Sequence, residues 1–150
     1  MTKKQLHILV LHGPNLNLLG EREPDIYGKT TLEEINTELV QTGKDHGAEV
    51  KCFQSNHEGQ LVDWLHEYRS WADGVIINPG ALTHYGLSLH DAITAVAKPA
   101  IEVHLSNIYE REVWRRKSVI AAACKGVIAG LGPDGYFKAL KQVLKILRSD

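Results

Sequence analysis

Residues 6–28 bring a phenol, a guanidinium and an amide close together in the chain. Tyr27 can act as a base only in its phenolate form, because the pKa of a phenol is about 10. Lowering that pKa to about 7 requires roughly 4 kcal/mol of preference for the ionised form. One nearby cation lowers a pKa by about 1 to 3 units, so two cations suffice where one is marginal. Arg22 precedes Tyr27, and Arg111 or Arg115 can approach from a later loop; the alternative is a half-buried tyrosine that only packs its ring.

The segment Glu102-Val103-His104 pairs a carboxylate with an imidazole. Residues two apart share one face of a strand, so Glu102 can orient His104 and raise its pKa. A histidine held in this way can donate a proton to a leaving group. Metal ligation is the alternative, but the eight histidines form no HExxH motif and no clustered Cys/His spacing. We therefore expect no metal at this site.

Further short polar side chains stand where apolar runs end. Asn78 and His84 follow one such run, and Ser106 follows another. These groups suit the hydroxyls and the carboxylate of a small ligand. Ser106, with the backbone amides of Leu105 and Ser106, can hold an anion, and capping of the next turn by Ser106 is compatible with that role.

These residues need a scaffold of strands that end close together. Apolar runs predict five strands, over 6–11, 48–54, 74–78, 100–105 and 126–129. They alternate with helical patterns, which favours an α/β fold with helices on both faces of a parallel sheet. We expect one flavodoxin-like domain over residues 1–150 with strand order 2-1-3-4-5. The site should then lie at the carboxyl ends of strands one, three and four.

Capping and stop signals place the helices. Thr31 and Glu34 fit a capping box, and Gly47 fits the end of that helix. Ser55 and Glu58 suit the start of the next helix, a third runs from about 87 to 97, and Asp134 is expected to cap the last.

Composition excludes several classes of protein. The net charge of −1 over 150 residues leaves no electrostatic footprint for nucleic acid. No apolar run approaches membrane-spanning length, and the first strand is too short for a signal-peptide core. Cys52 and Cys124 fit small buried hydrophobes rather than a disulfide framework. We expect a soluble protein of the reducing cytoplasm.

Functions other than catalysis find less support in the sequence. Gly130, Gly132 and Gly135 form a GxGxxG motif, which is typical of dinucleotide binding. The motif follows the last strand, and too little chain remains for a second βαβ unit, so dinucleotide binding is not expected here. A flavodoxin-like module for a nucleotide or flavin is the alternative function, although no phosphate-cradling run follows the first strand. A receiver-like domain would need an acidic end to the third strand, where Asn78 stands.

Taken together, the motifs resemble those of one enzyme family, the type II 3-dehydroquinate dehydratases. They span nearly the whole chain in the right order: HGPNLNLLGEREPDIYG, FQSNHEGQLVDWLH, INPGALTH, Asp91, PAIEVHLSN, REVWRRKS and GVIAGLGPDGY. The resemblance implies a flavodoxin-like subunit assembled as trimers packed into a dodecamer. It also implies dehydration of 3-dehydroquinate to 3-dehydroshikimate without metal or organic cofactor.

The resemblance also implies a role for each matching residue. Tyr27 resembles the general base, Arg22 the residue that assists it, and Asn15 the group that stabilises an enolate through water. His104 resembles the acid that protonates the departing hydroxyl, with Glu102 behind it. The substrate-binding positions are matched by Asn78, His84, Leu105, Ser106, Arg115 and Asp91, the last of which the family reaches across a subunit boundary.

Overall fold

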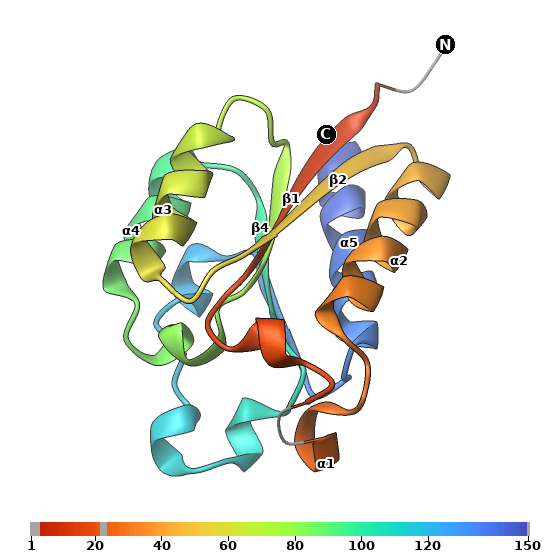
Figure 1. Ribbon diagram of the computed structural model, residues 1–150. Coiled ribbons are helices and arrows are strands. Elements are labelled where there is room, and N and C mark those ends of the chain that lie inside the picture. The colour runs from red at the N-terminus through yellow and green to blue at the C-terminus, as the bar shows by residue number, and fades with distance from the viewer. Residues whose placement is uncertain (1–3, 22–23, 150) are drawn as a thin grey trace.

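A five-stranded parallel sheet forms the centre of the molecule, with helices on both faces (Figure 1). The computed structural model describes residues 4–21 and 24–149, with the backbone alone at Ile26 and Tyr27. The strands are β1 (Leu6–His12), β2 (Ala48–Gln54), β3 (Gly74–Asn78), β4 (Ala100–His104) and β5 (Gly126–Ala129). Their order is β2-β1-β3-β4-β5, so the predicted flavodoxin-like topology is confirmed.

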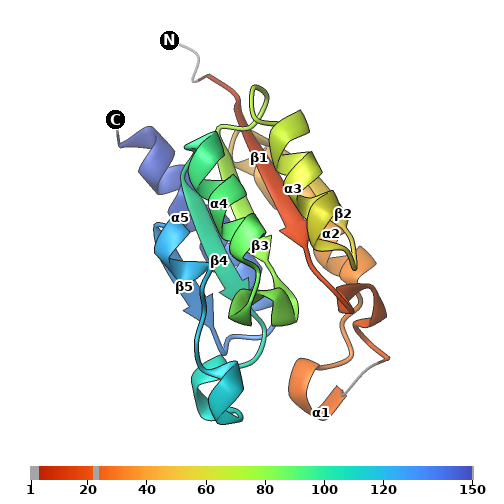
Figure 2. The same cartoon turned by 90° about the vertical axis from the view of Figure 1, so that its left-hand side faces the viewer.

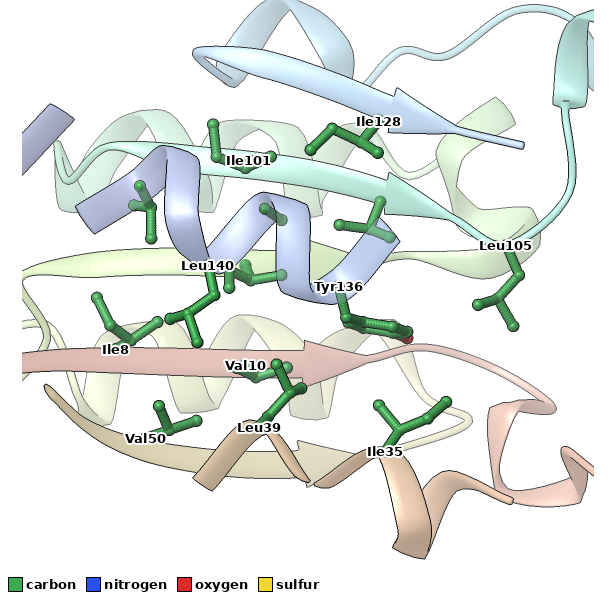
Figure 3. Close-up of a cluster of buried hydrophobic side chains, with 14 of the residues drawn as sticks. Ile8, Val10, Ile35, Leu39, Val50, Ile101, Leu105, Ile128, Tyr136 and Leu140 are labelled. Atoms are coloured by element: carbon green, nitrogen blue, oxygen red, sulfur yellow. The ribbon is translucent and has the colours of Figure 1, made fainter. Parts of the chain in front are cut away.

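Two pairs of helices cover the sheet. The helices are α1 (Pro24–Tyr27), α2 (Leu32–Asp45), α3 (Glu58–Glu67), α4 (Leu87–Val96) and α5 (Asp134–Arg148). Figure 1 shows α2 and α5 on one face and α3 and α4 on the other. Alternate residues of β1 feed the two cores, because successive side chains of a strand point to opposite faces. Ile8 and Val10 pack with α2 and α5, as Figure 3 shows, and Leu9 and Leu11 pack on the opposite face.

Strand register brings polar residues to one edge of the sheet. His12 at the end of β1 is paired with Gln54 of β2 and with Asn78 of β3. His104 ends β4 opposite Ala129 of β5. The loops that leave these strand ends lie at one end of the molecule, together with α1 and the segment 106–119 (Figure 2). The chain therefore collects its polar loops where an open α/β sheet normally binds its ligand.

Several local expectations hold and others are wrong. Thr31 caps α2 by accepting a hydrogen bond from the Glu34 amide, and Gly47 follows the helix with a positive φ of 77°. Asp134 does not cap α5: Pro133 occupies the N-cap position, and Asp134 is the first helical residue, where its charge still favours the helix dipole. Ser55 precedes α3 by more than one residue, and its hydroxyl accepts from the His57 amide instead.

Short turns of helix that the apolar pattern did not predict connect the strands to the site. They are 3₁₀ turns at Leu16–Leu18, Gly80–His84, Ile108–Glu110, Val113–Arg115 and Ala121–Ala123. Such turns carry too few residues to show a periodicity. Across residues 4–21 and 24–149, no helix combines the length and the apolarity that crossing a membrane requires.

Candidate active site

A polar cleft lies beyond the carboxyl ends of β1, β3 and β4. It encloses about 610 Å³ of empty space, part of it open to solvent. The walls come from the loops after those three strands and from the segment after β4. The lining residues are Pro14, Asn15, Leu16, Asn78, Gly80, Ala81, His84, His104, Leu105, Ser106, Ile108, Arg111 and Arg115.

The most constrained part of the site is the pair formed by Glu102 and His104. Both side chains leave the same face of β4, and Nε2 of His104 contacts Oε2 of Glu102. The Thr83 hydroxyl donates to the same carboxylate oxygen at 2.6 Å, and the Ser118 hydroxyl donates to both oxygens at 2.9 Å. Because an ionised carboxylate only accepts, Nε2 of His104 carries a hydrogen. The Nδ1 atom is therefore the nitrogen left to exchange a proton with a ligand.

Burial makes this pair unusual. Glu102 is 0% exposed and His104 is 5% exposed. Burial acts to raise the pKa of Glu102. The hydrogen bond and charge of His104, together with the hydrogen bonds of Thr83 and Ser118, outweigh burial and lower this pKa below its ordinary value of 4.5. Glu102 is thus a buried anion whose donors replace the lost water. It lies behind His104 and does not line the cleft itself.

A second histidine, His84, is held by the segment that follows β4. Its Nδ1 lies 2.6 Å from the Lys117 carbonyl oxygen, which can only accept, so Nδ1 is the protonated nitrogen of the neutral ring. The ring of Trp114 meets His84 edge-on at 5.6 Å between centroids. The remaining nitrogen, Nε2, is an acceptor in that tautomer and suits a ligand hydroxyl.

Two arginines of the segment after β4 line the same cleft. The Arg115 guanidinium carbon lies 4.0 Å from the Trp114 ring centroid, and its Nε lies 2.9 Å from the Glu112 carboxylate without hydrogen-bond alignment. The Arg111 carbonyl accepts from Arg116 Nε at 3.0 Å. The two guanidinium groups give the cleft positive charge suited to an anionic ligand.

The loop after β1 is shaped by an uncommon backbone conformation. Asn15 adopts a left-handed conformation, with φ of 70°, which asparagine tolerates better than most residues. The backbone N–H of Asn15 donates to the side-chain oxygen of Asn56 at 3.0 Å. A Cβ at Gly13 would lie 2.5 Å from the Pro79 carbonyl oxygen, so only glycine permits this close approach between the loops after β1 and β3.

The sequence-predicted site residues other than Glu102, which lies behind His104, fall into three groups in the structure. The cleft brings together Asn15, Asn78, His84, His104, Leu105, Ser106, Arg111 and Arg115. Asp91 lies on α4 with a side chain that is 83% exposed, hydrogen-bonded to His90 Nδ1 at 3.0 Å, and does not line the cleft of its own chain. Arg22 and the side chain of Tyr27 lie outside the described residues; the backbone of Tyr27 ends α1 at the same end of the sheet (Figure 2).

Sequence reasoning missed two sets of supporting residues. Thr83 and Ser118 donate hydrogen bonds to Glu102. Both lie within motifs quoted above, but no spacing or periodicity in the sequence marks either residue as a partner of Glu102. His12 and Tyr136 form a second buried polar set behind Asn78. The helical spacing of Tyr136 with Leu140 and Val143 places it on the buried face of α5, a signal that could have found it.

Over the described part of the chain, no group of three or more His, Cys, Asp or Glu side chains is arranged to hold a metal ion. The donors at the cleft are instead amides, hydroxyls, guanidinium groups and two imidazoles.

Comparison with known proteins identifies the family. The model of the dehydroquinase class II family matches residues 6–144. A protein of Dictyoglomus turgidum named 3-dehydroquinate dehydratase is 56% identical over 138 residues, or 92% of this chain and 95% of that protein. The 3-dehydroquinate dehydratase 1 of Agrobacterium fabrum is 54% identical over 93% of this chain and 96% of that protein. The crystal structure of type II dehydroquinase from Butyrivibrio crossotus superposes with a TM-score of 0.91, at 43% identity, over 93% of this chain and 98% of that one. This chain belongs to the dehydroquinase class II family.

Proposed function

We propose that this chain is a hydro-lyase that converts 3-dehydroquinate to 3-dehydroshikimate in the shikimate pathway, by an anti elimination that needs no metal or organic cofactor. The observation that carries the proposal is the buried Glu102–His104 pair at the base of a polar, arginine-lined cleft. A chain of this family with that pair has an oriented proton donor where the substrate would sit. The names of its relatives supply the substrate.

The first step of the proposed reaction is proton removal beside the ketone. The α-proton of a ketone is weakly acidic, so the reaction needs both a strong base and stabilisation of the developing oxyanion. Tyr27, as phenolate, takes the proton, and the electrons of the C–H bond pass to the carbonyl oxygen as an enolate. Arg22 assists the phenolate, Arg111 contributes positive charge from the segment after β4, and Asn15 stabilises the enolate through a water molecule.

The second step is loss of the β-hydroxyl. The enolate collapses to a conjugated enone as the C–O bond breaks, and His104 protonates the departing oxygen so that it leaves as water. Glu102 keeps the Nε2–H tautomer in place and stabilises the imidazolium form. Base and acid on different loops allow the proton and the hydroxyl to leave from opposite faces.

Substrate binding uses the remaining polar groups of the cleft. Asn78, Leu105, Ser106, His84 and Arg115 line it and suit the carboxylate and hydroxyls of the substrate. Asp91 is 83% exposed and away from its own cleft, which fits a role at the site of a neighbouring subunit. We therefore propose a homo-oligomer, trimers packed into a dodecamer, acting in the cytoplasm.

A rate assay tests this function. Purified protein in buffer containing a chelator should generate the absorbance of a conjugated enone when 3-dehydroquinate is added. His104→Ala should lose most of this turnover while Kd for the substrate changes modestly. No enone formation by the wild-type protein would refute the proposal, and a yellow protein with bound flavin would support the binding-module alternative instead.

A further inference from the structure

A chain of buried hydrogen bonds runs behind the cleft from Asn78 to α2. Asn78 Nδ2 lies 3.0 Å from the Tyr136 hydroxyl, which lies 2.8 Å from Nδ1 of His12. Nε2 of His12 lies 2.8 Å from Oδ1 of Asn36. His12 and Tyr136 are both 0% exposed. Figure 3 shows Tyr136 reaching from α5 to the sheet beside the end of β1.

One backbone hydrogen fixes the orientation of the Asn78 amide, from which the other roles in this hydrogen-bond network are assigned. The Gly80 amide lies 3.1 Å from the Asn78 side-chain oxygen, and a backbone N–H can only donate, so that atom must be the carbonyl oxygen. The other end of the Asn78 amide is then the NH₂ group, which donates to Tyr136. The buried Tyr136 hydroxyl still has one hydrogen to donate, and its other described partner is Nδ1 of His12, which we assign as the acceptor.

The direction continues to the surface helix. Nδ1 of His12 accepts from Tyr136, so its hydrogen lies on Nε2, and Asn36 meets it with an oxygen. Burial lowers the pKa of His12 to about 4, against a smaller opposite effect of the Asn36 hydrogen bond, which keeps the ring neutral. Each polar group in this hydrogen-bond network is therefore assigned as either a donor or an acceptor toward its neighbour.

The orientation of the Asn78 amide matters for ligand binding, because Asn78 lines the cleft. An amide has two hydrogens, and the second hydrogen of Asn78 is left for a ligand. We infer that Tyr136 and His12 are positioning residues for substrate binding: they hold the Asn78 amide so that it presents N–H, and not C=O, to an anionic oxygen of the ligand. A reversed amide would turn its carbonyl dipole toward that oxygen and repel it.

This inference rests on the proposed function for its kinetic test. Tyr136→Phe keeps the ring and removes the hydroxyl, so we expect KM for 3-dehydroquinate to rise roughly tenfold, the usual effect of losing one buried partner. The value of kcat should fall by less than about threefold, because the Asn78 amide is expected to bind the substrate and the transition state equally well. Val143→Ala, on the same helix and equally buried, is the matched control and should leave KM unchanged.

A double-mutant cycle separates positioning from general loosening of the core. In an Asn78→Ala background, Tyr136→Phe should change KM by less than about twofold, because its effect passes through Asn78. The same rise in KM in both backgrounds, or an unchanged KM in Tyr136→Phe alone, would overturn the inference. If the wild-type protein shows no turnover, the proposed function fails, and the inference is then decided without activity.

The activity-free measurement uses nitrogen-15 NMR of the intact protein. His12 should appear as the neutral Nε2–H tautomer, and one Asn78 side-chain hydrogen should be protected from solvent exchange in the wild type. Tyr136→Phe should lose that protection. Hydrogen on Nδ1 of His12, or unchanged Asn78 protection in the variant, would contradict the assigned direction.

Discussion

Replacing Glu102 by glutamine would isolate the charge behind His104. The glutamine oxygen in the place of Oε2 keeps the hydrogen bonds from His104, Thr83 and Ser118. The amide nitrogen takes the place of Oε1, whose described partner is the Ser118 hydroxyl. The variant therefore preserves the shape of the side chain and the hydrogen bonds to Oε2, gives up the bond from Ser118 to Oε1, and removes the negative charge.

The size of the effect follows from that difference. Hydrogen bonds to charged groups are worth about 1.5 to 3 kcal/mol and those between neutral groups about 0.5 to 1.5 kcal/mol. Stabilisation of the His104 imidazolium should fall by about 1 to 2 kcal/mol, which lowers kcat roughly 5- to 30-fold. KM should change little, because Glu102 is buried and does not line the cleft.

Initial rates of enone formation from 3-dehydroquinate would measure this change. Glu58→Gln is a suitable control, because it converts another carboxylate that accepts a hydrogen bond, from the Leu89 amide at 3.0 Å, outside the cleft. That control should retain the wild-type kcat. A kcat for Glu102→Gln within twofold of wild type would refute the claim that the buried charge supports the acid.

Two further predictions concern the residues that support the site. Burial lowers the pKa of His12 from 6.5 to about 4, against the raising effect of Asn36, so as the pH falls through this window the unfolded chain binds a proton that the folded chain does not. The free energy of unfolding should thus fall by about 3 kcal/mol through this residue as the pH is lowered. Urea titrations at a series of pH values should show this dependence on pH in the wild type and not in His12→Gln; the same dependence in both proteins would contradict it. Gly13→Ala should cost about 1 to 3 kcal/mol and reduce activity, since its Cβ would press on the Pro79 backbone, whereas Gly59→Ala, which meets no atom within 4 Å, should be neutral or stabilising; equal thermal stability of the two variants would exclude the clash.

The sheet and the place of the site were predictable because both depend on local patterns. Five apolar runs alternating with helical stripes leave few topologies, and that topology dictates which strand ends meet. The pairing of Glu102 with His104 was predictable for the same reason, since residues two apart share one face of a strand.

The hydrogen-bond partners of the supporting residues were not predictable, because these bonds join residues far apart in sequence. Ser118 lies 16 residues from Glu102, and Tyr136 lies 124 residues from His12. A polar residue shows no periodicity that reveals its partner. The cap of α5 was missed for a different reason: Pro133 and Asp134 are both common at helix starts, and proline took the outer position.

The proposed reaction uses a base and a separate acid, and deuterium exchange tests this separation directly. In deuterium oxide, His104→Ala should incorporate deuterium beside the ketone of recovered 3-dehydroquinate faster than it forms product, because the enolate still forms but the hydroxyl leaves slowly. Tyr27→Phe should show neither exchange above the uncatalysed rate nor product. Exchange by Tyr27→Phe at the wild-type rate would contradict the assignment of the base.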